Sequence, residues 1–490
     1  GGYSYQYEVT EGFSAVNSNF PTDLYTYNRL QSGDALTQQN GPVSMNSDKS
    51  DSKLIGFFGR VNYSWRDKYL LMGSLRHEGS SKFGKNYQWG NFPAVSIGWR
   101  LNRESFFQNV KFINDLKLRA GYGITGTAPS SSYLSLVSLT YGTRFLYNGN
   151  WIQQIAPTRN PNPDLRWEKK QELNVGLDFG LLNDRLSGSI DVYQRTTKDM
   201  LFNYSVPTPP YLFNSILANV GSMRNRGIEV LVNVIPIRNK NMEWNSSITY
   251  SNNQNKLLTL SNTLFQTTID YIVSGGTGEP IQESTHRNYI GQAIGTFYGY
   301  KSIDIAPDST WIIEGADGKP KPMKSSNPSD KKILGNGIPK HIMGWNNTFR
   351  YKQVDLNVNI RGAFGFQILN FQKMYYSNPK IHQYNMLKSA FDPVYGKTPI
   401  YADLALVSYY VEQGDYVKID NISLGYTLNL HKNKMIKDVR VYVAGLNLVT
   451  ITKYSGVDPE VNRTGLNPGN DERDKYPTTR TFTVGANLSF

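Results

Sequence analysis

The strongest constraint on the fold is a strict two-residue alternation of apolar and polar side chains at the end of the chain. Phe482, Val484, Ala486, Leu488 and Phe490 alternate with threonine, glycine, asparagine and serine. Successive side chains of a strand point to opposite faces, so this segment predicts a strand with one apolar and one wet face. We expect the apolar set to face lipid, and Thr483, Gly485 and Asn487 to face a lumen.

The same alternation recurs along the chain, at 55–65, 116–123, 172–179, 228–234, 345–351, 354–361 and 421–428. One face of these segments is apolar, and the other carries Arg, Lys, Asp, Glu, Asn and Gly. A dry sandwich core would not hold unpaired charges, because burying them is costly, whereas a water-filled lumen would. The pattern therefore favours a membrane β-barrel over a soluble sandwich.

The connections between these segments alternate in length. Tight turns are expected at 66–68, 183–185, 238–240 and 351–353, with two longer connections on the same side at 102–114 and 431–437. Long polar segments are expected at 78–91, 125–167, 197–226, 251–340, 365–414 and 452–480. Short periplasmic turns and long extracellular loops are typical of outer-membrane barrels. The sequence predicts an all-β fold, a transmembrane antiparallel β-barrel wall of about 14 strands, beginning at Tyr3 to Phe13.

Composition narrows the class further. The absence of cysteine excludes disulfides and thiolate sites. The net charge of +13 indicates a basic surface facing anionic lipid head groups, or an attraction for acidic substrates, but the charges are too scattered for nucleic acid. No apolar run approaches the ~18–20 residues of a membrane helix. The chain begins at Gly1 without a signal peptide, so we expect that a targeting sequence was removed or that residues 1–490 are the C-terminal part of a longer barrel domain.

Several motifs resemble those of the SusC/RagA-type TonB-dependent outer-membrane transporters. They occur in the family's order at 55–63, 67–70, 162–168, 221–229, 291–300, 454–460 and 476–480, and the likeness covers nearly all of 52–490. The resemblance implies a 22-stranded barrel, an N-terminal plug, a segment that contacts TonB and a SusD-like surface lipoprotein. This chain has room for about 14 strands and shows no plug, so the remaining strands and the plug are expected outside it. The acidic loop of the family is only weakly represented here, because Glu314, Asp317 and Asp330 are spread among lysines and prolines, so we assign no calcium site to it.

Other motifs do not support catalysis. Residues 121–126 satisfy G-x-G-x-x-G, but a proline and serine-rich loop follows where a dinucleotide site needs a helix. The five histidines, His77, His286, His341, His382 and His431, show no metal-ligand spacing. No nucleophile–base arrangement is recognisable, so we expect neither an enzyme nor a cofactor.

Aromatic residues in the connections are the candidate contact residues for a substrate or a partner protein. They are Tyr87, Trp89, Tyr147, Trp151, Tyr211, Tyr289 and Trp311, all expected outside the regular strands. Sugar rings and peptide side chains pack well on aromatic surfaces, but packing within the loops would explain the same residues.

Together these features predict energised import of an oligomeric nutrient across the bacterial outer membrane. Glycans are favoured by the resemblance and peptides remain open. A passive porin-like channel and a surface-binding barrel without transport are the alternatives. A plug sequence would exclude the passive channel, and uptake assays would separate the surface-binding barrel.

Overall fold

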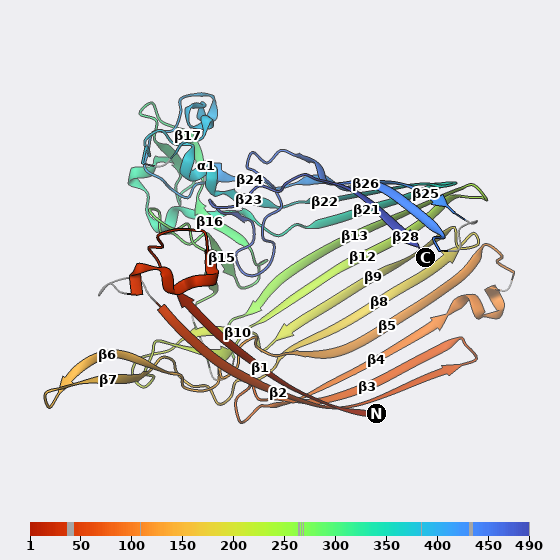
Figure 1. Ribbon diagram of the computed structural model, residues 1–490, viewed down its shortest axis with the longest axis horizontal. Coiled ribbons are helices and arrows are strands. Elements are labelled where there is room, and N and C mark those ends of the chain that lie inside the picture. Colours follow the sequence, from red (N-terminus) through yellow and green to blue (C-terminus); the bar gives the residue numbers. More distant parts are fainter. Residues whose placement is uncertain are drawn as a thin grey trace.

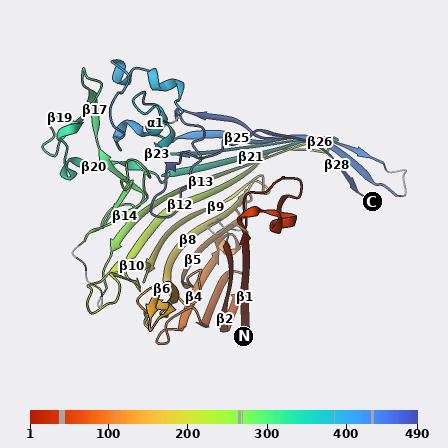
Figure 2. The same ribbon diagram turned by 60° about the vertical axis from the view of Figure 1, so that its left-hand side comes forward.

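One antiparallel sheet of 14 strands forms the body of the protein. The computed structural model describes residues 1–36, 44–107, 109–262, 265, 267, 269–383, 385–430 and 435–489. The sheet follows the chain order and curves as a single open layer (Figures 1 and 2). Its strands are β1 (Gly2–Val16), β2 (Ser44–Trp65), β3 (Tyr69–Ser80), β4 (Trp89–Arg100), β5 (Ile113–Thr127), β8 (Glu168–Leu181), β9 (Leu186–Lys198), β12 (Ser222–Arg238), β13 (Met242–Thr259), β21 (His341–Tyr351), β22 (Val354–Phe364), β25 (Tyr416–Asn429), β26 (Asp438–Thr452) and β28 (Thr481–Ser489). The expected strand number is therefore confirmed, including the first strand, which pairs with β2 along its whole length.

The two faces of the sheet differ as the alternation predicts. On what we call the apolar face, Val61 is 70% exposed, Ile97 58% and Val484 83%, so these residues contact no protein core. On the opposite, polar face lie charged residues such as Arg119 and Asp178, which form an ion pair across neighbouring strands. The ladder between β12 and β13 sets Val232 opposite Ile248, so the apolar face is continuous from strand to strand.

The sheet has two unpaired edges. Strand β28 pairs with β26 from Leu446↔Thr481 to Asp438↔Ser489, as expected. Strand β1 forms the other edge, and no ladder joins it to β28 in the part of the chain that the structure describes. Phe490, which continues the alternation, lies outside the described residues. The sheet is thus an open wall in this structure.

Tight turns join the strands at one end, which we call the turn edge. Arg66 and Asp67 both have positive φ angles, of 52° and 53°, between β2 and β3. Two such residues form the turn whose twist matches that of the flanking strands. Asn183 and Asp184 do the same between β8 and β9. The predicted connection at 431–437 lies partly outside the described residues.

The longer connection between β4 and β5 folds onto the apolar face at this turn edge. It contains η3 (Leu101–Arg103) and η4 (Ser105–Phe107). Glu104 accepts hydrogen bonds from Lys68 (3.0 Å), Tyr69 (2.9 Å) and Trp99 (3.1 Å). Trp65, Tyr69 and Trp99 stack in a row here, an arrangement typical of an interfacial aromatic girdle.

The opposite end, which we call the loop edge, carries further structure. Two hairpins pair β6 (Leu139–Tyr147) with β7 (Asn150–Pro157), and β10 (Leu201–Ser205) with β11 (Ser215–Asn219). A four-stranded sheet contains β14 (Tyr271–Ser274), β15 (His286–Tyr289), β16 (Thr296–Tyr300) and β20 (Lys331–Asn336). Smaller sheets contain β17 (Ser302–Ile305), β18 (Trp311–Glu314) and β19 (Pro320–Pro322), and β23 (Gln367–Asn370), β24 (Val411–Gln413) and β27 (Asn470–Asp471). Helical turns are α1 (Phe371–Tyr376), η1 (Thr26–Ser32), η2 (Asp34–Leu36), η5 (Met323–Ser325), η6 (Pro328–Asp330), η7 (Lys388–Phe391), η8 (Val394–Gly396) and η9 (Ser408–Tyr410).

Three of these connections fold together into a compact unit at the upper left of Figure 1, which we call the loop module. It comprises the described residues of 269–340, 365–414 and 453–480. Its apolar core includes Phe297, Trp311, Tyr375, Leu406 and Tyr410, each at most 2% exposed. The sequence predicted these segments as polar loops; their apolar residues lack a regular period, so pattern alone did not reveal a core. Among the described residues no helix is both long and apolar enough to cross a bilayer.

Candidate functional site

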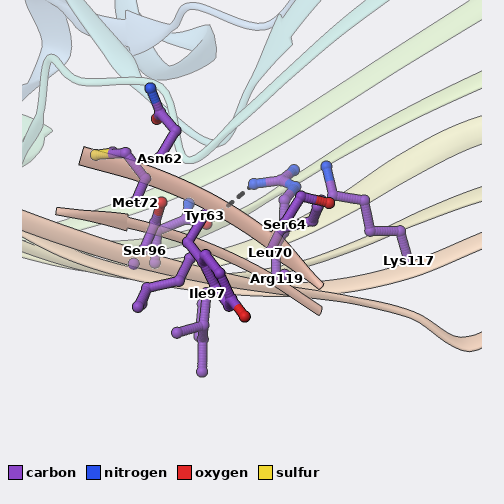
Figure 3. A pocket seen from close by; sticks show the side chains of 14 residues that line it. Asn62, Tyr63, Ser64, Leu70, Met72, Ser96, Ile97, Lys117 and Arg119 are labelled. Atoms are coloured by element: carbon purple, nitrogen blue, oxygen red, sulfur yellow. Dashed lines mark hydrogen bonds between the residues drawn. The ribbon is translucent and has the colours of Figure 1, made fainter. Parts of the chain in front are cut away.

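A hollow lies on the polar face of the wall. Its volume is about 530 Å³, and side chains of β2, β3, β4, β5 and β8 line it. Figure 3 shows Asn62, Lys117 and Arg119 on one side of the strands and Ile97 on the other. Gly98 and Gly121 form part of the base of the hollow, where they add no side chain between the flanking polar groups. The hollow therefore presents cationic and amide groups above a small-residue floor.

Ion pairs between strands that are adjacent or one strand apart order this polar face. Arg119 donates to Asp178 at 3.1 Å and to Asp191 at 2.6 Å, and so links β5, β8 and β9. Further along the sheet, Arg440 contacts Asp355 at 2.5 Å from β26 to β22. These side chains are about 15–31% exposed, so they remain accessible to water while their partners offset their charges. The arrangement suits a hydrated passage lined by fixed charges.

A buried ion-pair network attaches the loop between β26 and β28 to the same face. The side chain of Lys418, on β25, is 1% exposed and donates to Asp458 at 2.9 Å and to Glu460 at 3.1 Å. Arg361, on β22, also contacts Glu460, and its hydrogen bond to Glu460 is the main reason that the pKa of that carboxyl falls to about 2. Removing one member would leave a buried charge unpaired, so the network fixes the loop against the wall.

The sequence missed the role of both networks. Residues 454–460 stood out only as a motif, and the partners of Asp458 and Glu460 lie about 40 to 100 residues away. The only feature of the sequence that pointed to these networks was a charged residue at a polar-face position of a strand, as at Lys418 and Arg361. That signal gives the face of each residue but not its partner.

Carboxylates of the loop module are bound by lysines. Hydrogen bonds from Lys301 and Lys332 lower the pKa of Glu314 to about 2. A hydrogen bond from Lys321, with the backbone N–H of Asn327, lowers the pKa of Asp330 to about 2. Within the described residues no group of His, Asp and Glu has the geometry of a metal site.

The histidines lie apart from one another. His77 stacks on Trp89, His341 forms a hydrogen bond with Tyr250, and His382 contacts the carbonyl of Lys380. His286 is buried in the loop module, where desolvation lowers its pKa to about 4. His431 lies outside the described residues.

The structure separates the seven candidate aromatic residues. Tyr147 (58% exposed) and Trp151 (68%) lie on the β6–β7 hairpin, and Tyr87 (44%) lies in the β3–β4 connection. Tyr211 packs partly against a small core beside β11, and Tyr289 ends β15 beside Tyr271. Trp311 is 1% exposed inside the loop module, so its side chain is covered.

The expected position of Trp89 outside the strands is wrong. Trp89 begins β4 and lies on the apolar face, at even spacing from Val95 and Ile97. It stacks with His77 at 4.7 Å and with Phe57 at 6.4 Å. This geometry is that of an aromatic girdle near the loop edge, which sequence position alone did not distinguish from a loop contact. Tyr147, Trp151, Tyr289 and Trp311 also belong to short strands, although not to the main sheet.

A meandering sheet with an apolar face, a charged opposite face, tight turns at one end and long loops at the other defines the wall of a transmembrane β-barrel. Residues 1–448 match the family described as "TonB dependent receptor-like, beta-barrel". The chain belongs to this family of outer-membrane β-barrel proteins.

Individual relatives agree with this assignment. TonB-dependent receptor P3 of Formosa agariphila is 32% identical over 516 residues, covering 100% of this chain and 50% of that protein. TonB-dependent receptor SusC of Bacteroides thetaiotaomicron is 29% identical over 487 residues, covering 94% of this chain and 46% of that protein. A chain of the RagAB peptide importer in its 'open-open' state has the same fold, with a TM-score of 0.82 at 23% identity, covering 100% of this chain and 52% of that one. The expected SusC/RagA-type likeness is confirmed, and the chain spans about half the length of the curated relatives it matches.

Proposed function

We propose that residues 1–490 form most of the barrel wall of a TonB-dependent importer that takes up oligomeric nutrients. The observation that carries this proposal is the 14-stranded wall of this member of the family, with ion pairs on its polar face and a folded loop module at its loop edge. Such a wall binds and guides a hydrated solute and performs no bond chemistry. Glycans are the favoured cargo and peptides the alternative.

The open edges support strands outside residues 1–490. Unpaired N–H and C=O groups cost several kcal/mol each in lipid, so β1 and β28 both need partners in a membrane. The relatives are about twice as long as this chain, which leaves room for further strands, a plug and a TonB-contacting segment. A structure of the intact assembly tests this: β28 should pair with a strand from outside these residues, and a β28–β1 ladder would contradict it.

A surface lipoprotein of the SusD type is the proposed partner at the loop edge. The β6–β7 hairpin projects from the body (Figure 1) and exposes Tyr141 (73%), Leu146 (59%) and Trp151 (68%). Large apolar side chains gathered on one projecting hairpin are typical of a protein contact. Tyr87, Tyr147, Tyr211 and Tyr289 remain candidate contacts for the partner or the substrate.

The partner test uses the protein purified from native membranes. Trp151→Glu combined with Tyr147→Glu should abolish co-purification of the lipoprotein. Phe391→Glu, at a residue 63% exposed in the loop module, is the matched control and should retain it. Retention by all variants would argue against the hairpin contact.

Uptake by cells expressing the whole protein tests the transport proposal. Labelled oligosaccharides and labelled oligopeptides are supplied separately, with and without a protonophore. We expect one class to enter, and its entry to stop when the proton-motive force collapses. Entry that continues would favour a passive channel, and binding without entry a surface receptor.

A further inference from the structure

Five cations lie together on the apolar face, at the loop edge of four neighbouring strands. We call Lys169, Lys198, Arg224, Arg226 and Lys256 the basic cluster. The ladders place Lys169 directly opposite Lys198, and Arg224 directly opposite Lys256. Like charges directly opposite one another destabilise an antiparallel pair. Two such pairs side by side therefore need an explanation.

Alternation assigns these cations to the apolar face. Arg224 and Arg226 are at even spacing from Ile228, and Ile228 is opposite Val192, which is 55% exposed. Arg226 donates to Gln254 at 3.1 and 3.2 Å, which places both side chains on one face. The polar face carries the intervening residues, as the ion pair between Arg195 and Glu172 shows.

The cluster lacks carboxylate partners. Across the described ranges, none of its five members forms an ion pair with a described acidic residue. On the polar face at a similar depth, Arg195 is paired with Glu172 at 2.6 Å, whereas Lys170 forms no ion pair with a described acidic residue. Five neighbouring cations, two pairs of them directly opposite one another and none with a described carboxylate partner, indicate that the anion for the basic cluster comes from outside the chain.

The position of the basic cluster along the strands indicates where it lies relative to the membrane. A tilted membrane strand needs about 9–11 residues, and the run from Ile228 to the end of β12 at Arg238 supplies this span. The membrane then ends near Ile228, and Arg226 and Arg224 lie one and two side-chain steps beyond it, toward the loops. Lipid head groups occupy that level of the bilayer.

We propose that the basic cluster binds the phosphate groups of lipid head groups in the outer leaflet. Guanidinium groups grip phosphate oxygens in pairs, and the lysines add point charges around them. The proposal rests on the membrane placement of the proposed function, and it names particular residues for the basic surface that the net charge indicated.

The test uses the full-length protein in phosphatidylcholine nanodiscs containing increasing fractions of diphosphorylated lipid A. Bound lipid A is counted by native mass spectrometry. The cluster variant combines Lys198→Gln, Arg224→Gln, Arg226→Gln and Lys256→Gln. The matched control removes four exposed cations at the turn edge, through Arg66→Gln, Arg103→Gln, Lys240→Gln and Lys352→Gln.

We expect the cluster variant to bind lipid A at least about tenfold more weakly and the control to stay within about twofold, because each cation near an anionic lipid surface adds attraction. Equal binding by the two variants would overturn the proposal. So would equally tight binding of dephosphorylated lipid A, or displacement of lipid A by millimolar inorganic phosphate. Loss of the co-purifying lipoprotein with lipid A binding unchanged would assign the cluster to a protein contact instead. Uptake is measured on the same variants, so failure of transport and failure of lipid binding are seen separately.

Discussion

The main sheet and the loop module distribute their apolar residues in opposite ways. The sheet exposes Val61, Ile97 and Val484 at 58–83% on one face and carries ion-paired residues such as Arg119 and Asp178 on the other. The loop module covers Phe297, Trp311 and Tyr410 to 2% or less. The two regions of the chain therefore suit different solvents. Hydrocarbon surrounds the apolar face of the sheet, and water surrounds the loop module. In the sheet, an exposed apolar residue indicates a contact with lipid. In the loop module, an apolar residue stabilises the fold only when it is buried.

The two regions also differ in what holds them together. In the sheet, ladders between neighbouring strands satisfy the backbone without any apolar core, as a wall in lipid requires. The loop module has only short ladders, such as the three residue pairs that join β18 to β19. Its stability must therefore come from the buried aromatic residues and from the carboxylate–lysine pairs.

The largest effect is expected from Trp311→Ala in the loop module. Deleting a buried tryptophan leaves a cavity and costs about 3–5 kcal/mol. Hydrogen exchange should rise across β16, β18 and α1 and stay unchanged in the main sheet. Trp151→Ala, at an exposed position, is the control and should change stability by less than about 0.5 kcal/mol. Loss of protection in the sheet as well would show that the regions do not unfold separately.

A charge on the apolar face should affect only the sheet. Val232 lies on this face midway along the membrane run of β12, opposite Ile248. Val232→Arg should destabilise the folded barrel by about 2–4 kcal/mol, because a cation there meets hydrocarbon. Asn233→Arg, on the polar face, should cost far less in the same equilibrium unfolding assay in lipid vesicles. Equal costs for the two would mean that the faces are assigned wrongly.

The sequence predicted one region much better than the other. Two-residue alternation placed Val232 and Val484 on the apolar face, because every second side chain of a membrane strand faces lipid. The burial of Trp311 could not be read, since its neighbours Tyr395, Tyr409 and Tyr410 come from a connection about 90 residues later. The partners of Lys418 were unpredictable for the same reason, and Trp89 was misplaced because a girdle residue and a loop residue both sit at strand ends.

A smaller effect is expected from lowering the pH, which should reduce the stability of the loop module and leave the main sheet unchanged. His286 accepts from Thr285 and donates to the carbonyl of Pro468, and burial lowers its pKa from 6.5 to about 4. The folded module therefore holds a neutral ring, while the unfolded chain takes up a proton below about pH 6.5. Stability should be complete above pH 6.5 and fall by about 2 kcal/mol by pH 5.

Module stability followed by hydrogen exchange from pH 8 to 5 checks this prediction. His286→Gln should flatten the profile in that window, whatever its effect on absolute stability. A profile that is unchanged in the variant would assign the pH dependence to other groups. Glu314 and Asp330 titrate lower, toward pH 2, so they should not contribute between pH 8 and 5.

Accessibility of spin labels along β28 and β12 tests most directly whether the sheet is a membrane wall. Labels are placed singly at Phe482, Val484 and Leu488, and at Thr483 and Asn487, with Val232 and Asn233 as the pair on a central strand. In the intact protein in lipid, the first set and Val232 should be reached by oxygen dissolved in the bilayer, and the others by a water-soluble nickel reagent. The reverse pattern, or equal access to both reagents on the two faces, would contradict the account.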